Sequence, residues 1–376
     1  AYIVNYDMPS RTAGSVHAAK MCQAFVQEGY SPTLCAFRPS SLDDANANFF
    51  HHYGVQESFD IDLISNRKLL RGHDFALKTA YRIKQGQFPL VFSRGLLSAM
   101  WTAILGIPTV YETHQPPETR LGQYYLRILL ERKAFQKLVV ISEGLKQRYL
   151  ERYPRLLSSE QILVEADAVD LERFEDLPES RVARKKLNLL EEVFTVGYAG
   201  HLYEGRGIEL ILGVAGRLPD AHFLLMGGEE KDIHHWQQII QSQQLENVRL
   251  VGFVPNAQLP TYLAACEVLL MPYQHNIRVQ GSTISTHEWM SPMKMFEYMA
   301  AERLIRSSDF PILRPILNEQ NAVLCRPESV EEWEQAIRDA MEKPEWRKKL
   351  AQQARRDVER YTWRRRVHRI MAQIEL

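Results

Sequence analysis

The chain has 376 residues, of which 45% are hydrophobic and 24% charged, the composition of a globular protein with room for two domains or three. Lysine plus arginine and aspartate plus glutamate both number 46, so the net charge is zero and no overall positive field draws the chain to nucleic acid. The four cysteines are scattered without a C-x-x-C pair, and no apolar run reaches the roughly 18–20 residues of a spanning helix. We therefore expect a soluble, cytoplasmic protein with neither a disulfide framework nor a zinc knuckle.

The first half of the chain alternates short runs rich in Val, Ile, Leu and Tyr with longer amphipathic stretches. This alternation is typical of parallel βαβ units, in which helices cover both faces of a sheet. The spacing predicts a helix at 14–27 and strands at 2–5, 32–36, 61–64, 90–93, 109–112, 137–141 and 162–165. This half is therefore expected to be of the α/β class.

The second half repeats this rhythm and then becomes helical. Strands are predicted at 195–199, 222–226, 248–251 and 268–271, and helices at 207–216, 236–244, 259–265, 331–343, 345–359 and 364–374. A charged segment at 172–192 separates the halves, as expected of a linker that carries a helix. Two doubly wound domains, divided near residue 180, are expected to face a central cleft at the carboxyl ends of their strands, where such folds bind ligands.

A glycine-rich stretch, GHLYEGRG at 200–207, follows a predicted strand and opens a predicted helix. Glycines let a backbone approach a ligand, and the free N–H groups of a helix N-terminus favour an anion, to which Arg206 can add a bidentate contact. The stretch therefore fits a phosphate site. A tight turn with a solvated Arg206 explains the same residues, and the spacing matches neither the dinucleotide nor the P-loop pattern.

A second candidate is SPMKMFEYMA at 291–300, in which Ser291 suits a helix N-cap and the apolar residues recur at helical spacing. Lys294 then lies in the first turn, where the helix dipole disfavours a cation unless an anion is present. Glu297, one turn later, could accept hydrogen bonds from the two hydroxyl groups of a ribose. An ordinary amphipathic helix with a surface Lys294–Glu297 pair is the alternative.

Two loops of the first half add further candidates. Gly14 and Ser15 open the helix after the first strand, where backbone N–H groups could bind a diphosphate, although a plain connecting loop is an equal alternative. His114 ends a predicted strand, where side chains point toward the cleft, although a lone histidine is usually structural. Asp60 and Asp62 have the D-x-D spelling of some metal sites but lack supporting ligands.

Basic residues also cluster in the first half, interleaved with leucine and tyrosine. They are Arg67, Lys68, Arg71, Lys78, Arg82, Lys84, Arg120, Arg127, Arg132, Lys133 and Lys137. With neighbours such as Leu69 and Tyr124 they could contact a membrane surface that carries a lipid-linked acceptor, at the inner face of the membrane. A solvated helix face is the more common alternative.

The order of these stretches resembles the retaining glycosyltransferases of family 4. The resemblance is carried by VISEGLK at 140–146, ADAVDLERF at 166–174, VGFVP at 251–255, SDFP at 308–311 and the stretches at 200–207 and 291–300. It implies the GT-B fold, with Rossmann-like domains at 1–178 and 179–359 and a C-terminal helix, about 360–376, that crosses back to the first domain.

The resemblance also implies the chemistry. A sugar would pass from a nucleoside diphosphate sugar, with UDP favoured over GDP, to a hydroxyl group, without a cofactor or a catalytic metal. The acceptor would be a glycan, a lipid-linked molecule or a small molecule, in polysaccharide, glycolipid or other glycoconjugate biosynthesis.

Single positions receive roles from the same resemblance. Its catalytic set is His114, at the junction of donor sugar and acceptor, with Arg206 and Lys294, which contact the diphosphate. Glu297 corresponds to the carboxylate that binds the ribose. The other donor-binding positions are Gly14, Ser15, His201, Phe253, Val254 and Met293.

Some positions depart from the family pattern. Trp289 replaces the first carboxylate of E-x7-E, and Glu302 and Leu304 replace the glycine and proline of A-x-G-x-P. These departures keep open the hypothesis of a non-catalytic sugar-nucleotide-binding or scaffold protein. A second alternative, a GT-B sugar-nucleotide epimerase, shares the architecture but needs carboxylates of its own in the cleft, and the family-4 motifs disfavour it.

Overall fold

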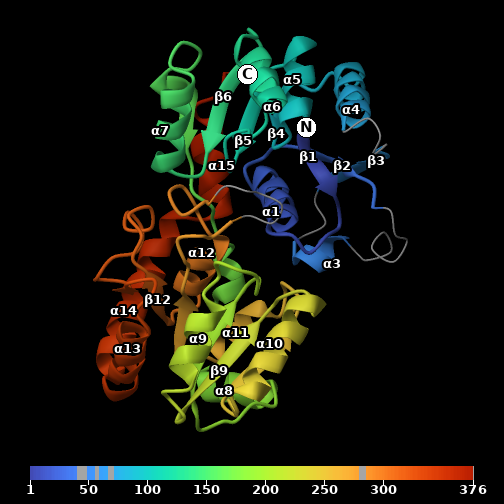
Figure 1. Ribbon diagram of the computed structural model, residues 1–376. Helices are drawn as coiled ribbons and strands as arrows, with labels where there is room; N and C mark the ends of the chain where they lie inside the picture. Colours follow the sequence, from blue (N-terminus) through green and yellow to red (C-terminus); the bar gives the residue numbers. More distant parts are fainter. Residues whose placement is uncertain (40–48, 56–58, 67–71, 279–284, 376) are drawn as a thin grey trace. The chain divides into compact units, whose positions relative to one another are not determined.

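The computed structural model describes residues 1–39, 49–55, 59–66, 72–278 and 285–375. The chain divides into two compact units, the first comprising Ala1–Ala168 with Trp363–Leu376 and the second Val169–Thr362 (Figure 1). Three members of the basic cluster predicted above, Arg67, Lys68 and Arg71, and the neighbouring Leu69 lie outside the described residues. Within the described ranges, no helix is both long enough and apolar enough to cross a membrane.

The first unit is a parallel sheet covered by helices. Its described strands have the order β3-β2-β1-β4-β5-β6-β7. They are β1 (Tyr2–Asp7), β2 (Thr33–Phe37), β3 (Asp60–Ile64), β4 (Val91–Ser93), β5 (Thr109–Thr113), β6 (Phe135–Val140) and β7 (Ile162–Val164). The helices are α1 (Ala13–Gln27), α3 (Phe49–Tyr53), α4 (His73–Gln85), α5 (Leu96–Ile104), α6 (Arg120–Leu130), α7 (Glu143–Arg152) and α15 (Trp363–Met371). All seven predicted strands are confirmed to within two residues at each end.

The second unit has its own parallel sheet, in the order β10-β9-β8-β11-β12-β13 among its described residues. The strands are β8 (Phe194–Ala199), β9 (Ala221–Met226), β10 (Val248–Gly252), β11 (Val268–Met271), β12 (Leu304–Ser308) and β13 (Val323–Cys325). The helices are α8 (Ser180–Lys186), α9 (Ile208–Ala215), α10 (Glu230–Ser242), α11 (Leu259–Ala264), α12 (Met293–Ala300), α13 (Val330–Glu342) and α14 (Pro344–Asp357). The sequence pattern predicts the first four strands but misses β12 and β13, because β12 contains Arg306 and two serines and β13 is only three residues long.

The chain passes between the units at two neighbouring points. The Val169 N–H donates to the Tyr361 carbonyl oxygen at 3.0 Å, so both crossings leave the second unit side by side. The first crossing follows residue 168, ten residues before the predicted 178, and the second follows residue 362. Helix α15 then joins the first unit beside α1, where Arg364 Nε donates to Glu28 Oε1 at 2.7 Å. The predicted return of the last helix is confirmed.

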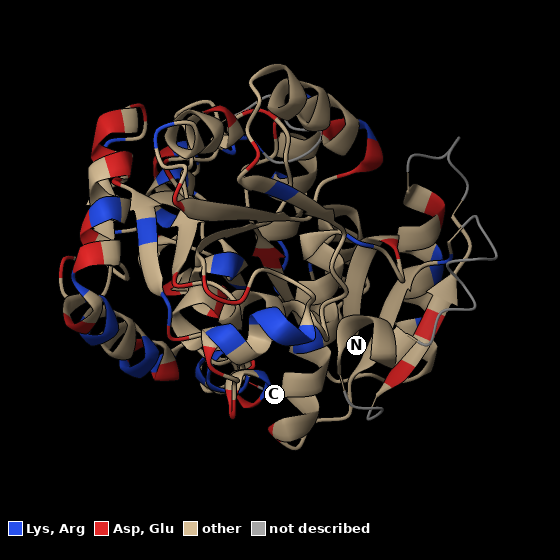
Figure 2. Cartoon of the chain, turned by 90° about the horizontal axis from the view of Figure 1, so that it is seen from below, with Lys and Arg blue, Asp and Glu red and all other residues tan. Residues whose placement is uncertain are grey.

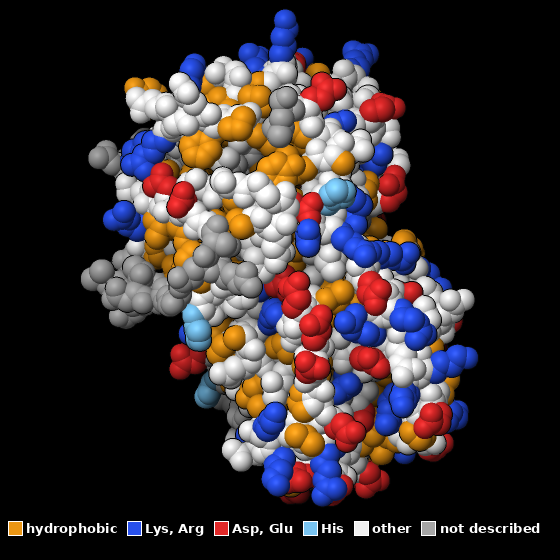
Figure 3. Space-filling model, turned by 180° about the vertical axis from the view of Figure 1, so that it is seen from behind, with side chains coloured by type: hydrophobic (Ala, Val, Ile, Leu, Met, Phe, Trp, Pro, Cys, Tyr) orange, Lys and Arg blue, Asp and Glu red, His pale blue; other side chains and the backbone are white. Residues whose placement is uncertain are grey.

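The two units present different surfaces. On the face drawn in Figure 3, hydrophobic side chains gather on the first unit, whereas charged side chains of both signs cover the second. In the second unit, helices α13 and α14 carry acidic and basic residues close together (Figure 2), and α13 holds Arg338 Nη2 2.9 Å from Glu334 Oε1. Charges of opposite sign therefore lie next to each other on these two helices.

Candidate active site

The predicted glycine-rich stretch lies between β8 and α9. Gly207, with φ 76°, is the N-cap of α9, and a β-carbon there would lie 1.9 Å from the Pro272 carbonyl oxygen. A β-carbon on Gly205 would lie 2.7 Å from neighbouring backbone. These two glycines are therefore required for close packing of the chain on itself. Gly200 differs, because a β-carbon there would lie 2.6 Å from Lys294 Nζ, so this glycine leaves space for the amino group.

Lys294 has a buried amino group with aromatic neighbours. Its Nζ lies 4.0 Å from the centre of the Tyr198 ring and 5.3 Å from that of Tyr273. The same atom makes no hydrogen bond in the part of the chain that the structure describes. Burial lowers the pKa of Lys294 well below its ordinary value, and Arg206 lowers it further. These surroundings therefore disfavour the charged form of Lys294, and a bound anion would favour it.

The start of α12 places Lys294 where the backbone adds to this effect. The N-cap is Pro292, which has no polar side chain, so the prediction that Ser291 caps the helix is wrong. Met293 and Lys294 occupy the first turn, where unpaired N–H groups already create a positive potential. Glu297, partly exposed one turn later, raises the pKa of Lys294 but does not cancel the effect of burial.

Arg206 brings a second positive group to the same place. Its guanidinium lies 4.7 Å from the centre of the Tyr203 ring and 5.5 Å from that of Tyr273, and it donates to the Tyr203 hydroxyl. Its Nε is buried and has no hydrogen-bond acceptor among the described residues. Lys294 and Arg206 thus approach Tyr273 together, each with a buried nitrogen left unpaired. Burying positive charge in this way is costly unless an anion binds.

The remaining donor-side predictions also follow strands of this sheet. His201 comes directly after Gly200, and burial, then Arg206, then Lys294 lower its pKa to about 4, so it is neutral at physiological pH. Phe253 is exposed and Val254 half-buried in the loop after β10. The carboxyl edge of the sheet therefore combines two cations, a neutral imidazole and an accessible loop.

The departures from the family pattern have separate physical explanations. Trp289 is only 2% exposed, so it belongs to the interior of the unit. Glu302 follows the C-cap of α12 with φ 52°, the left-handed conformation that favours glycine, which accounts for the glycine usual at this position. Leu304 opens β12, fully buried and paired with β11. Glu302 and Leu304 therefore affect the helix end and the strand start, whereas Trp289 removes a carboxylate.

In the first unit, Gly14 and Ser15 are tied into the start of α1. The Ser15 hydroxyl donates to the carbonyl oxygens of Ser10 and Thr12, both at 2.8 Å, and its N–H donates to Thr12. The Gly14 carbonyl oxygen accepts from the Tyr6 hydroxyl at 2.6 Å. These bonds hold the loop in shape, and the predicted phosphate contact of Gly14 and Ser15 stays a prediction.

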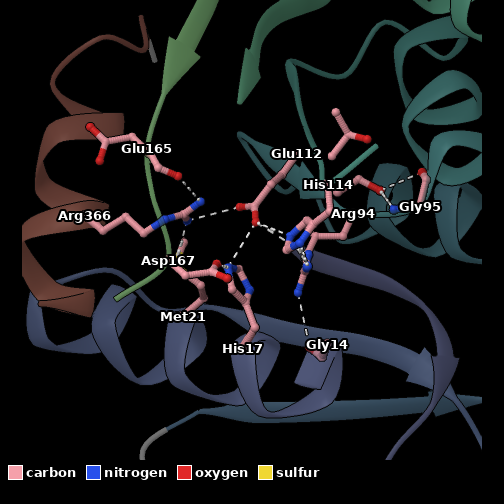
Figure 4. Close-up of polar contacts among 12 residues, drawn as sticks. Gly14, His17, Met21, Arg94, Gly95, Glu112, His114, Glu165, Asp167 and Arg366 are labelled. Atoms are coloured by element: carbon pink, nitrogen blue, oxygen red, sulfur yellow. Dashed lines mark hydrogen bonds and ion pairs between the residues drawn. The ribbon is translucent and has the colours of Figure 1, made fainter. Parts of the chain in front are cut away.

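His114 belongs to a cluster around Glu112, the fourth residue of β5 (Figure 4). Glu112 is fully buried, and its Oε1 lies 3.1 Å from His17 Nε2 and 3.4 Å from His114 Nε2. The Arg94 Nε lies 3.5 Å from the same oxygen, and Arg94 also contacts His114. Arg366 Nη1, from α15, donates to the other oxygen, Oε2, at 3.1 Å. Helices from both ends of the chain therefore meet at this strand.

The cluster keeps its carboxylate charged and its imidazoles neutral. Burial and then Arg94 lower the pKa of His17 and of His114, that of His17 well below its ordinary value. Burial alone would raise the pKa of Glu112, but Arg366, followed by His17, outweighs it, so this pKa lies well below the usual range. His114 is therefore expected to act as a hydrogen-bonding group rather than as a cation.

The same residues have the spacing of a metal site. Donor atoms of His17, Glu112 and His114 lie within 4.8 Å of one another. However, the buried guanidinium groups of Arg94 and Arg366 approach Glu112 from two sides. Since their positive charges already neutralise the carboxylate and would repel a cation, we interpret the cluster as a charge network around His114.

Several members of this cluster are missed by sequence reasoning. His17, Arg94, Glu112 and Arg366 carry no motif, and they meet only through the fold. One signal was available for Arg366: it lies on the buried stripe of α15, with Trp363, Val367 and Ile370 at helical spacing. An arginine on such a stripe indicates a buried partner, although the sequence does not identify it.

Comparison with protein families gives matches in both units. Residues 14–173 match the model described as Glycosyltransferase Family 4, and residues 179–357 match Glycosyl transferases group 1. The two matches meet between residues 173 and 179, close to the predicted boundary. A sequence search of the curated proteins finds no match.

Solved structures extend the comparison to the whole chain. HepE from Anabaena, in complex with UDP, has a TM-score of 0.77 and 13% identity, with 100% of both chains covered. Sucrose-phosphate synthase from Thermosynechococcus elongatus has a TM-score of 0.75 and 17% identity, with 99% of this chain and 96% of that chain covered. A glycosyltransferase from Rickettsia africae has a TM-score of 0.75 and 14% identity, with 99% and 97% covered. With family models matched in both halves and this fold throughout, the chain is a glycosyltransferase with the GT-B fold.

Proposed function

We propose that the protein is a cytoplasmic, retaining hexosyltransferase that uses a nucleoside diphosphate sugar without a catalytic metal. The observation that carries this proposal is the pair of buried, unpaired nitrogens on Lys294 and Arg206. A diphosphate supplies the negative charge that both groups need. UDP is the favoured nucleotide, because HepE, which shares the fold, was crystallised with UDP and with UDP-glucose.

In the proposed reaction the acceptor hydroxyl attacks the anomeric carbon on the face from which the nucleotide leaves. The bond from that carbon to the diphosphate oxygen breaks, a bond to the acceptor oxygen forms, and the hydroxyl proton passes to the departing phosphate. Lys294 and Arg206 stabilise the charge that grows on the diphosphate, the task that a divalent ion performs in other transferases. The products would serve polysaccharide, glycolipid or other glycoconjugate synthesis.

The donor site is tested by nucleotide binding in EDTA. We expect one of UDP, GDP, ADP and TDP to raise the melting temperature, because a ligand at about 100 times Kd stabilises the native state by about 2.7 kcal/mol. Lys294→Met should weaken that binding about 10- to 100-fold, since a charge-assisted hydrogen bond contributes about 1.5–3 kcal/mol. Lys348→Met, on the exposed face of α14, is the matched control and should bind normally.

The outcomes separate the competing functions. No shift with any nucleotide would contradict the proposal. Nucleotide binding without transfer or donor hydrolysis would favour the non-catalytic alternative, which the buried Trp289 at the place of an expected carboxylate supports. Conversion of the donor into an isomeric sugar nucleotide would favour the epimerase.

We also propose a membrane-contacting surface on the first unit, formed by α4, α5 and α6. Of the nine large hydrophobic residues exposed in the described chain, five lie on these three helices: Leu77, Tyr81, Ile104, Leu121 and Tyr124. Helix α5 contacts both α4 and α6, and His73 Nε2 lies 2.9 Å from the Tyr125 hydroxyl. Apolar and aromatic groups therefore share one exposed region of adjacent helices.

The excess of positive charge on these three helices favours an anionic lipid surface as the partner. The three helices contain five cations, namely Lys78, Arg82, Lys84, Arg120 and Arg127, and a single acid, the buried Asp74. Arg82 pairs with Asp62 and Arg127 with Glu131, but such exposed pairs are weak and leave the arginines available to lipid phosphates. Aromatic residues ringed by Lys and Arg are typical of helices that lie on a membrane.

Co-sedimentation with vesicles tests this surface. We expect binding to vesicles that contain phosphatidylglycerol, weaker binding at high salt, and little binding to pure phosphatidylcholine. The double variant Leu121→Ser/Tyr124→Ser should lose about tenfold or more in affinity, because it removes two apolar anchors. Val182→Ser, which removes an exposed apolar residue from the second unit, is the control. Equal binding by the double variant and the control would contradict the assignment, and self-association without vesicle binding would point to a second copy as partner.

A further inference from the structure

The last helix of the chain places one arginine in the interior of the first unit. Arg366 is 0% exposed, whereas Arg364 and Arg365 on the same helix are exposed. Its Nε donates to the Ala166 carbonyl oxygen at 3.0 Å and its Nη2 to that of Glu165 at 3.2 Å. Its Nη1 donates to Glu112 Oε2 at 3.1 Å. The guanidinium is therefore fully oriented by the fold.

Glu112 extends this contact to the predicted catalytic histidine. Its second oxygen, Oε1, faces His17 and His114, so one carboxylate joins α15 to the end of β5 (Figure 4). Without Arg366, only Arg94 would remain as a charged partner of this buried carboxylate among the contacts described. Removing one member of a buried ion pair leaves a charge that the neighbouring groups must neutralise.

We propose that Arg366 is a positioning residue for His114, acting through Glu112, so that the last helix of the chain completes this part of the active site. The inference rests on the proposed function only where it assigns His114 a role in transfer. Docking of α15 alone does not require this contact, because Arg369 Nη2 already binds the Glu165 carboxylate at 2.7 Å on the same helix. The buried contact between Arg366 and Glu112 can therefore serve to position His114.

The proposal has an electrostatic consequence for the whole cluster. The charged and titratable groups around Glu112 are Tyr2 and Tyr6 of β1, His17 of α1, Arg94 after β4, His114 after β5, Asp167 after β7, and Arg366 of α15. Arg366 is the main group that opposes the effect of burial on Glu112, and it also lowers the pKa of His17. When its charge is removed, an imidazole is the nearest group that can take up a compensating proton.

The first test needs no substrate. In the full-length protein, NMR titration follows the imidazole protons of His17 and His114, assigned with His17→Gln and His114→Gln. In Arg366→Met, one of the two should take up its proton at least one pH unit higher than in the parent protein, a tenfold change in the proton-binding constant. Arg366→Lys should restore most of the parent titration, and Arg369→Ala, the matched control on α15, should leave it unchanged. Superimposable curves for the parent and a folded Arg366→Met would overturn the proposal.

A second variant covers the case in which Arg366→Met does not fold. Arg366→Met/Glu112→Gln removes both charges, so neither is left buried without its partner. We expect it to fold and to lose tenfold or more in kcat, with the KM for the donor changed less than twofold, because Lys294 and Arg206 are untouched. Full turnover in this variant would also overturn the proposal. If the parent protein binds no nucleotide, the proposed function fails, while the NMR titration still decides the role of Arg366.

Discussion

At the level of single residues, three histidines lie in surroundings that disfavour a positive charge on the imidazole ring. His17 is buried and His114 is partly exposed near Arg94, and His201 is partly exposed near Arg206 and Lys294. All three therefore have a lowered pKa. In both units, imidazoles next to basic groups are therefore expected to stay neutral, and the two partly exposed ones, His114 and His201, remain accessible as uncharged hydrogen-bonding groups.

This arrangement predicts a loss of stability in acid, with a contribution from His201 that can be isolated. An unfolded imidazole takes up a proton near pH 6.5, whereas His201 in the folded protein does so at about 4. Between these values the unfolded state binds more protons, so the free energy of unfolding falls as the pH drops from about 6.5 to about 4, by about 3 kcal/mol in total. His201→Gln should make the melting temperature less dependent on pH in this window, while His234→Gln, at an exposed position of α10, should not. If the melting temperature of His201→Gln depends on pH as that of the parent protein does, the site does not disfavour the protonated form of His201.

At the level of elements, β12 carries an unexpected charge in its middle. Arg306 is 1% exposed, its Nε and Nη2 have no hydrogen-bond partner among the described residues, and its guanidinium lies 5.6 Å from the centre of the Trp346 ring. Burial lowers its pKa to about 10. This arginine is also why the strand escapes sequence reasoning, since a charge in the middle of a short apolar run argues against a buried strand.

Replacing this arginine should therefore stabilise the protein. Arg306→Met fills similar space without a charge, and we expect the free energy of unfolding to rise by about 1–3 kcal/mol, because burying an unpaired polar group is costly. Arg184→Met provides the contrast. Arg184 is also buried, but it pairs with Glu267 at 2.7 Å, so its loss should destabilise the second unit by about 3–5 kcal/mol. Thermal or urea unfolding of both variants measures these changes. If Arg306→Met proves less stable than the parent protein, the charge of Arg306 has a stabilising partner and the prediction is wrong.

At the level of the whole molecule, the sequence predicts what is local and misses what is formed by distant segments. The βαβ rhythm locates most strands. Arg206 is found because it lies in a glycine-rich loop between a strand and a helix, and Lys294 because it lies in the first turn of a recognisable helix. The pairing of Glu112 with Arg366, 254 residues later, follows from the return of α15 to the first unit, which no local pattern contains. The boundary between the units, after residue 168, likewise depends on the pairing of Val169 with Tyr361. It lies before the charged segment at 172–192, where the sequence places it.

The return of the last helix predicts how the molecule responds to its removal. A chain that ends at Thr362 lacks Trp363, Arg366 and the rest of α15, and leaves Glu112 buried without its main partner. We expect hydrogen exchange at β5 and α1 to accelerate tenfold or more, because a broken buried pair costs about 3–5 kcal/mol. Exchange at α9 and α12 should stay unchanged, since the groups that hold the second unit together lie within residues 169–362. Equal acceleration in both units would mean that they unfold as one, whereas acceleration confined to the first would establish that its histidine cluster depends on a helix from the far end of the chain.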